Sequence, residues 1–165
     1  MRTLTLLAIA TFLPHAAAAD TAAGAIFDAD GAEIGMVRLV DQPSGTTSIT
    51  IEASGFDEGV HAVHLHEVGA CDAPDFESAG GHIPGDAEHG VGVEGGPHPG
   101  DLPNAHVQSD GVIAVEYFND RITVADLLDD DGSALIVHTG ADDYESQPSG
   151  DAGGRLACAV IEAAG

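Results

Sequence analysis

Apolar and polar residues alternate along much of this chain with a period of two. In residues 46–53, for example, Ile49 and Ile51 fall on one face while Ser48 and Thr50 fall on the other. Side chains at positions i and i+2 of a strand point to the same face, so this alternation is typical of a half-buried antiparallel strand. The pattern therefore predicts β-structure, and no segment shows a convincing amphipathic helix.

Similar runs recur along the chain and are separated by Gly-containing turns such as Asp30-Gly31, which favours hairpins. The predicted strands are residues 24–28, 34–40, 46–53, 60–68, 104–108, 112–117, 133–138 and 155–163. Eight short strands with turn residues between them predict an all-β sandwich or barrel.

Two long segments, residues 69–103 and 139–154, interrupt this rhythm. Structureless segments of this length are uncommon in compact domains and usually carry function. We therefore expect two long functional loops on an all-β domain.

The first 19 residues predict a cleaved secretory signal peptide. Arg2 precedes the apolar stretch 4–13, and three alanines stand just before Asp20, as at a signal-peptidase site. Ten apolar residues fall well short of the ~20 that span a bilayer. The mature domain is predicted to be residues 20–165, in the periplasm or secreted.

The chain has two cysteines, Cys71 and Cys158. An even number of cysteines in an exported chain predicts one disulfide.

The charge balance is strongly acidic, with 28 Asp and Glu residues against four arginines and no lysine. Nucleic acids and anionic membranes both require a basic face, so neither is expected as a partner. The acids are scattered, which indicates a solvated acidic surface. Halophilic adaptation and a codon bias both stay open as its source, and monomer and homodimer stay open as assemblies.

The predicted strand 60–68 contains a His-x-His motif. His64 and His66 share one face of that strand, while Val63 and Leu65 point the other way. Paired neutral imidazoles suit copper and zinc far better than magnesium or calcium. Two structural histidines are the alternative, which is weakened by the further ligand types that follow at short range.

The first long segment holds four such residues, His82, His89, His98 and Asp101, among glycines and prolines. Three imidazoles and one carboxylate make a complete four-coordinate zinc site. The alternative is a set of surface histidines in a flexible loop.

Three further histidines belong to predicted strands. His138 ends the strand 133–138 and would complete the His-x-His pair. His61 is expected to be a hydrogen-bonding or core residue next to that pair, and His106 stays unassigned.

Five motifs in order together resemble the secreted bacterial copper–zinc superoxide dismutases. The resemblance is weak before Gly59 and strong after it. It rests on His64-Leu-His66-Glu67, Gly80-Gly81-His82, His98-Pro-Gly-Asp101-Leu, Val137-His138 and Gly154-Arg155-Leu-Ala-Cys158. This resemblance implies an eight-stranded Greek-key β-barrel with metal ligands on two long loops and adjoining strands.

The resemblance also implies two metal sites that share one ligand, His82, as a bridging imidazolate. The implied copper ligands are His64, His66, His82 and His138. The implied zinc ligands are His82, His89, His98 and Asp101.

Other residues take roles from the same resemblance. Asp142 matches the family's aspartate that hydrogen-bonds a copper-bound and a zinc-bound histidine. Arg155 matches the arginine at the mouth of the copper channel, where a fixed guanidinium can dock an anion. Cys71 and Cys158 match the disulfide that ties the metal loop to the last strand.

The implied activity is superoxide dismutation by a copper redox cycle, with His82 and Arg155 as the catalytic residues and superoxide as the substrate. A periplasmic copper or zinc store without turnover is the alternative. A zinc hydrolase is disfavoured because four protein ligands close the zinc site. The second loop has no lysine, so the resemblance leaves turnover efficiency in question.

Overall fold

The computed structural model describes residues 20–164, and the predicted signal peptide, residues 1–19, lies outside the described residues. The described chain consists almost entirely of β-strands and loops. The strands are β1 (Thr21–Asp28), β2 (Glu33–Asp41), β3 (Thr47–Ser54), β4 (Gly59–His61), β5 (Val63–His66), β6 (Ala105–Val107), β7 (Val112–Asn119), β8 (Ser133–His138) and β9 (Arg155–Ala163).

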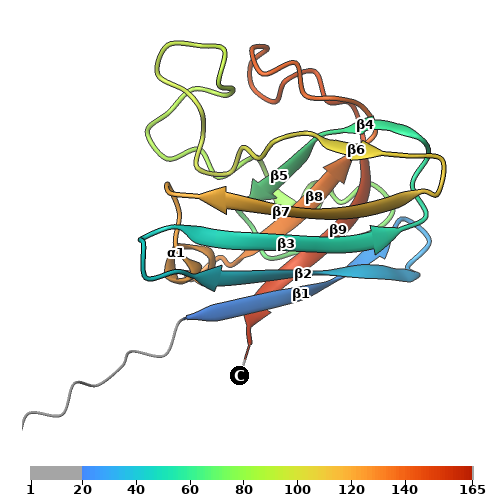
Figure 1. Cartoon of the computed structure of the whole chain (residues 1–165), viewed down its shortest axis with the longest axis horizontal. Coiled ribbons are helices and arrows are strands. Elements are labelled where there is room, and N and C mark those ends of the chain that lie inside the picture. The colour runs from blue at the N-terminus through green and yellow to red at the C-terminus, as the bar shows by residue number, and fades with distance from the viewer. Residues whose placement is uncertain (1–19, 165) are drawn as a thin grey trace, which may run out of the picture.

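Seven of these strands form one curled antiparallel sheet in the order β5-β8-β9-β1-β2-β3-β7, and β4 pairs with β6 in a second ladder (Figure 1). Consecutive strands β1, β2 and β3 are neighbours, whereas β7 and β8 lie at different places in the sheet and are joined by a crossover. Crossovers of this kind are typical of Greek-key connections. The predicted all-β class is confirmed, in the form of a half-barrel.

The single strand predicted over residues 60–68 is wrong in detail, because Ala62 interrupts it. The backbone N–H of Ala62 donates to the carbonyl of Gly140 at 2.8 Å, and the N–H of His138 donates to the carbonyl of Ala62 at 2.9 Å. Ala62 therefore leaves the ladder to bind the start of the second loop, and the described chain has nine strands instead of eight. The other seven predicted strands overlap observed ones.

Two short helical segments escaped the sequence pattern, η1 (Glu77–Ala79) and α1 (Val124–Leu127). A capping box formed by Thr123 and Asp126 starts α1, which satisfies backbone N–H groups that have no partner within so short a helix. Neither helix approaches the length or apolar character needed to cross a membrane.

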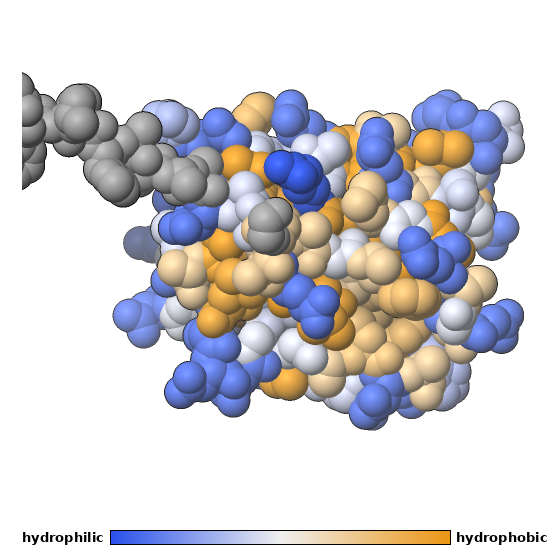
Figure 2. Space-filling view, turned by 90° about the horizontal axis from the view of Figure 1, so that it is seen from below, coloured by the Kyte–Doolittle hydropathy of each residue, from blue (hydrophilic) through white to orange (hydrophobic). Residues whose placement is uncertain are grey.

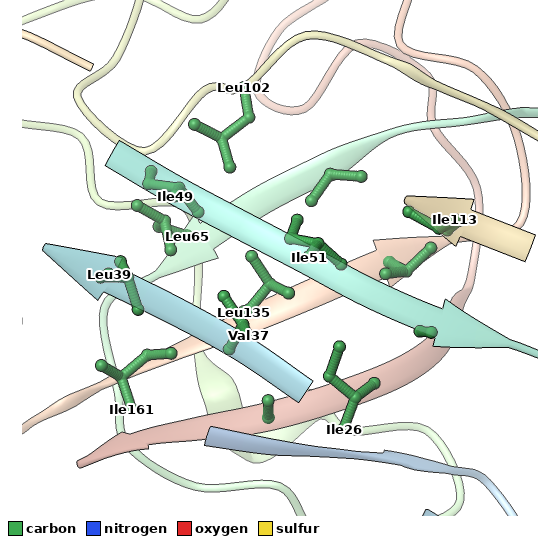
Figure 3. Close-up of a cluster of buried hydrophobic side chains, with 14 of the residues drawn as sticks. Ile26, Val37, Leu39, Ile49, Ile51, Leu65, Leu102, Ile113, Leu135 and Ile161 are labelled. Atoms are coloured by element: carbon green, nitrogen blue, oxygen red, sulfur yellow. The ribbon is translucent and has the colours of Figure 1, made fainter. Parts of the chain in front are cut away.

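The apolar core fills the inside of the curled sheet (Figure 3). Its side chains come from the inner faces of the strands, as the alternation predicts, and each contributes about 1.5–3 kcal/mol by burial. They include Ile26, Val37, Leu39, Ile49, Ile51, Leu65, Ile113, Leu135 and Ile161.

Figure 2 views the side on which β1 lies in Figure 1 and shows apolar surface in the middle of this face, with hydrophilic side chains around its rim. Phe27 of β1 and Met36 of β2 are among the exposed apolar side chains, at 39% and 52%. Elsewhere the scattered acids lie mostly at the surface.

The two long loops rise beside each other at one side of the molecule, near β4 and β6 (Figure 1). They are hydrogen-bonded to one another: the N–H of Gly92 donates to the carbonyl of Tyr144 at 2.9 Å, and the Gln147 side chain donates to the carbonyl of His89 at 2.8 Å. The fold therefore brings residues from the two segments into one region over β5 and β8.

Candidate metal centre

Four imidazoles converge beneath the loops. His64 and His66 come from β5, His138 from the end of β8 and His82 from the first loop. One ring nitrogen of each lies within 4.8 Å of the others, and all four side chains are buried. The closest pair is His64 and His82, whose ring centres are 3.8 Å apart.

These four rings carry nitrogens that no hydrogen bond satisfies. They are buried without a hydrogen-bond partner, although buried polar atoms nearly always have one. The atoms are Nδ1 of His64, Nε2 of His66, Nε2 of His82 and both ring nitrogens of His138. Such a cluster of imidazole nitrogens fits a metal that prefers nitrogen ligands, as copper does.

The opposite nitrogens of two rings are fixed by hydrogen bonds. Nε2 of His64 donates to Asp142 Oδ2 at 2.9 Å, and Nδ1 of His66 donates to the carbonyl of Gly80 at 2.9 Å. These bonds set the tautomer and orientation of each ring, and leave the other nitrogen free to bind a metal.

Burial keeps the imidazoles of His64, His66 and His138 neutral. It lowers the pKa of His64 to about 4, of His66 to about 2 and of His138 to about 3. Neutral imidazole is the form that binds a metal, so no proton has to leave these rings at neutral pH.

A second group of donors surrounds Asp101. Its Oδ1 lies 3.0 Å from Nδ1 of His82, 3.0 Å from Nδ1 of His89 and 3.3 Å from Nδ1 of His98. Burial would raise the pKa of Asp101, but hydrogen bonds from His82 and from the backbone N–H of Gly90 hold it well below its usual range. Three imidazoles and an ionised carboxylate fit zinc.

One set of ligand atoms that lie within 4.8 Å of one another on this side comprises His64, His82, His89 and Asp101, without His98. The resemblance implies His98 in this group in place of His64, and two observations bear on that choice. Nδ1 of His98 is buried and has no hydrogen-bond partner, whereas Nε2 of His64 is already bound to Asp142.

His82 belongs to both groups. Its Nε2 is buried without a hydrogen-bond partner, while its Nδ1 contacts Asp101 at 3.0 Å. One ring therefore faces two clusters of metal-ligand type.

Asp142 joins the two groups from the second loop. Its buried carboxylate accepts from Nε2 of His64 at 2.9 Å and from Nε2 of His89 at 3.0 Å. Burial would raise the pKa of Asp142, but the hydrogen bonds from His64 and from the N–H of Tyr144 lower it. The ionised carboxylate thus orients one ring of each group.

Two residues that position Asp142 were missed from the sequence. The Asn104 side chain accepts from the N–H of Asp142 and donates to its carbonyl, both at 2.9 Å. Gly150 lies so close that a Cβ there would stand 1.8 Å from Asp142 Oδ1, and its φ of +68° also favours glycine. No sequence signal separates Gly150 from the other 21 glycines.

Arg155 begins β9 and reaches the first loop. Its guanidinium donates to the carbonyl of Phe76 and, at 2.7 Å, to the carbonyl of Gly80, which also accepts from His66. Cys71 and Cys158 form a disulfide with Cα atoms 5.8 Å apart, which ties the same loop to β9. Arg155 and His66 therefore share the carbonyl of Gly80 as an acceptor, which fixes the guanidinium next to the imidazole cluster.

The two remaining histidines of the described chain lie outside both groups. The ring nitrogens of His61 lie 2.8 Å from the carbonyl of His138 and 3.1 Å from that of Asp57. His61 thus ties β4 to the end of β8, whereas His106 is exposed on β6.

Comparisons with known proteins agree with this geometry. Residues 33–161 match the family model described as copper/zinc superoxide dismutase (SODC). The chain is 40% identical to "Superoxide dismutase [Cu-Zn] 1" of Aquifex aeolicus over 83% of this chain and 85% of that protein. It is 39% identical to "Superoxide dismutase [Cu-Zn]" of Caulobacter vibrioides over 81% and 80%.

A solved structure gives the same result. The Cu/Zn superoxide dismutase from Brucella abortus superposes with a TM-score of 0.72 at 30% identity, covering 86% of this chain and 99% of that one. Sequence, fold and the arrangement of histidines thus agree, and the chain belongs to the copper/zinc superoxide dismutase family.

Proposed function

We propose that this chain is a superoxide dismutase that converts two superoxide anions and two protons into oxygen and hydrogen peroxide. Bound copper supplies the one-electron redox couple that this reaction needs, and zinc supplies a fixed positive charge beside it. The family assignment supports the activity and the two metals. The roles of individual residues below are our proposal.

In this proposal two sets of residues hold the metals, with His82 in both. His64, His66, His82 and His138 hold copper. His82, His89, His98 and Asp101 hold zinc. The observation that carries the proposal is the orientation of His82, with one ring nitrogen toward each cluster.

Two residues take part in the reaction itself. Nε2 of His82 would carry a proton in the half of the cycle in which it does not hold copper, and would give that proton to the product hydrogen peroxide in the other half. The Arg155 guanidinium, charged at every working pH and held by two carbonyls, docks the anion beside the cluster. Asp142 keeps the rings of His64 and His89 oriented throughout.

Metal content and superoxide consumption, measured on one preparation, test the function. We expect both metals and rapid dismutation in the wild type. Replacing Asp101 with Ala should remove zinc first and leave copper-dependent activity partly intact, while His106→Ala, an exposed control, should change neither. Metal binding without dismutation would favour the copper and zinc store, and loss of copper alone from Asp101→Ala would reverse the two sites.

We further propose that residues 1–19 are removed and that the domain of residues 20–165 works in the periplasm or outside the cell. The disulfide between Cys71 and Cys158 supports an oxidising compartment. Mass spectrometry of protein from the periplasmic fraction should give a chain that begins at Asp20. A chain in the cytosolic fraction that begins at Met1 would contradict this.

For partners, we propose superoxide, with neither nucleic acid nor membrane, and a homodimer as an open alternative to the monomer. The described residues carry three arginines against 28 acids, which disfavours both polyanionic surfaces. Monomer and homodimer are distinguished by sedimentation equilibrium of the loaded protein.

A further inference from the structure

The turn that holds Arg155 is itself acidic. The guanidinium binds the carbonyls of Phe76 and Gly80, which flank η1. Glu77, the first residue of η1, is exposed, and Asp75 beside it is exposed as well. Two carboxylates therefore stand on the turn that binds the guanidinium of Arg155.

The connectivity of the chain alone keeps Glu77 close to the Arg155 guanidinium. Arg155 donates to the carbonyl of Phe76, whose peptide bond leads directly to Glu77. Bond lengths then keep the Glu77 carboxylate within about 10 Å of the guanidinium. Burial lowers the pKa of Arg155, while the negative charges of Glu77 and Asp75 raise it.

Within residues 20–164, Arg155 is the only arginine or lysine on β9 or on the first loop, which contains η1. The chain has no lysine, and the other described arginines are Arg38 on β2 and Arg121 between β7 and α1. The attraction that Arg155 exerts on an anion is thus opposed locally, and not only by the net charge of the protein.

We propose that Glu77 limits the approach of superoxide, because its exposed carboxylate opposes the field of the Arg155 guanidinium at the mouth of the metal site. This inference rests on the proposed function of the site. It adds a residue that acts on substrate approach without touching copper, zinc or their ligands.

The expected size of the effect is modest and depends on salt. A unit charge at about 10 Å in water changes the local concentration of a monovalent anion by about twofold. The screening length falls from about 30 Å at 0.01 M salt to about 8 Å at 0.15 M. The effect of Glu77 should therefore be largest at low ionic strength.

Glu77→Gln is a clean variant because the Glu77 side chain makes no hydrogen bond within residues 20–164, whereas Asp75 accepts from the N–H of Glu77. Glu52→Gln is the matched control. Glu52 is exposed on β3, three strands from β9 in the sheet, which is about 14 Å at the usual strand spacing. Both variants remove one negative charge.

The experiment measures kcat/KM for superoxide between 0.01 and 0.15 M salt on copper- and zinc-loaded protein, together with the affinity for azide read from the visible spectrum of copper. For the wild type we expect a rate that stays flat or rises with salt. Glu77→Gln should raise kcat/KM and tighten azide binding by about twofold at 0.01 M, with most of the gain gone at 0.15 M.

Glu52→Gln should change both readouts much less than Glu77→Gln does, because the interaction between unit charges weakens with distance and with screening. Equal gains in the two variants would overturn the inference, since net charge and not Glu77 would then decide. An unchanged Glu77→Gln would overturn it as well. Arg155→Ala separates this from a failure of the proposed function: it should lower the rate and weaken azide binding, and if it did neither, the proposed role of Arg155 would fail instead.

Discussion

The two faces of β5 are buried to the same extent but carry different chemistry. Val63 and Leu65 are 0% exposed and pack into the apolar core. His64 and His66, at 0% and 1%, point to the other side and meet His82 and His138. One four-residue strand thus separates a packed interior from a cluster of polar rings.

The difference lies in what satisfies each face. The apolar face gains from burial and close packing alone. The histidine face keeps buried nitrogens without partners, and each costs about 1–3 kcal/mol until a partner binds. The apolar face of β5 needs no ligand, whereas the histidine face fits a metal, and bound metal should stabilise the folded protein substantially.

The largest effect should come from removing the ring that both metal groups share. His82→Ala should lower the occupancy of copper and zinc together and reduce dismutation by more than about 100-fold. Replacing even a residue that only hydrogen-bonds a metal ligand typically lowers metal affinity or activity about 10–100-fold. Elemental analysis and a superoxide assay measure this, with exposed His106→Ala as the control. Loss of a single metal with activity kept would show that His82 is not shared.

Acid should weaken the histidine face of the metal-free protein. The folded state keeps His64, His66 and His138 neutral down to about pH 4, 2 and 3, whereas the unfolded chain takes up protons below about 6.5. The unfolded state thus binds more protons, so stability is full above pH 6.5 and is lost as pH falls. Three such groups together should lower the free energy of unfolding by up to about 4 kcal/mol between pH 7.5 and 5.5.

Urea unfolding of chelator-treated protein at the two pH values measures this loss. Equal stability at both, or a gain at pH 5.5, would mean that these rings are not held neutral.

A substitution on the apolar face of β5 should lower the stability of the protein but leave its metal content unchanged. Leu65→Ala removes a fully buried side chain from the core and should cost about 3 kcal/mol. Metal per folded chain should stay as in the wild type, because Leu65 points away from the ligands. Denaturant unfolding and metal analysis give the two readouts, with Val112→Ala, 39% exposed on β7, as control. Metal loss from folded Leu65→Ala would show that the two faces are coupled.

The smallest effect concerns the glycine beside Asp142. Gly150→Ala would drive a methyl group into Asp142 Oδ1 and disturb the carboxylate that orients His64 and His89, so metal affinity should fall about 10-fold. Gly31→Ala is the matched control, since Gly31 also has a positive φ, +81°, but open space around it. Competition with a chelator measures affinity. Equal losses in both variants would point to backbone strain and not to Asp142.

The sequence predicted the strands because alternation is a local signal, and β8 and β9 match residues 133–138 and 155–163 as predicted. The histidines stood out by residue type and spacing. The interruption at Ala62 could not be predicted, because its partner Gly140 lies 78 positions away on the second loop.

The supports of Asp142 were hidden for the same reason. Asn104 reaches Asp142 across 38 positions, and the proximity of Gly150 depends on how the second loop folds onto the first. Contacts set by loop packing leave no periodic pattern in the sequence. The sequence therefore reveals the residues of metal-ligand type, but not the residues that orient them.

The most direct test of the account is anomalous diffraction from crystals of the loaded protein, collected at the copper and zinc absorption edges. We expect a copper peak about 2.0–2.1 Å from His82 Nε2 and a separate zinc peak about 2.0–2.1 Å from His82 Nδ1, next to Asp101. A single metal position, or two metals with His82 bound to only one of them, would contradict the shared ligand on which the proposed mechanism rests.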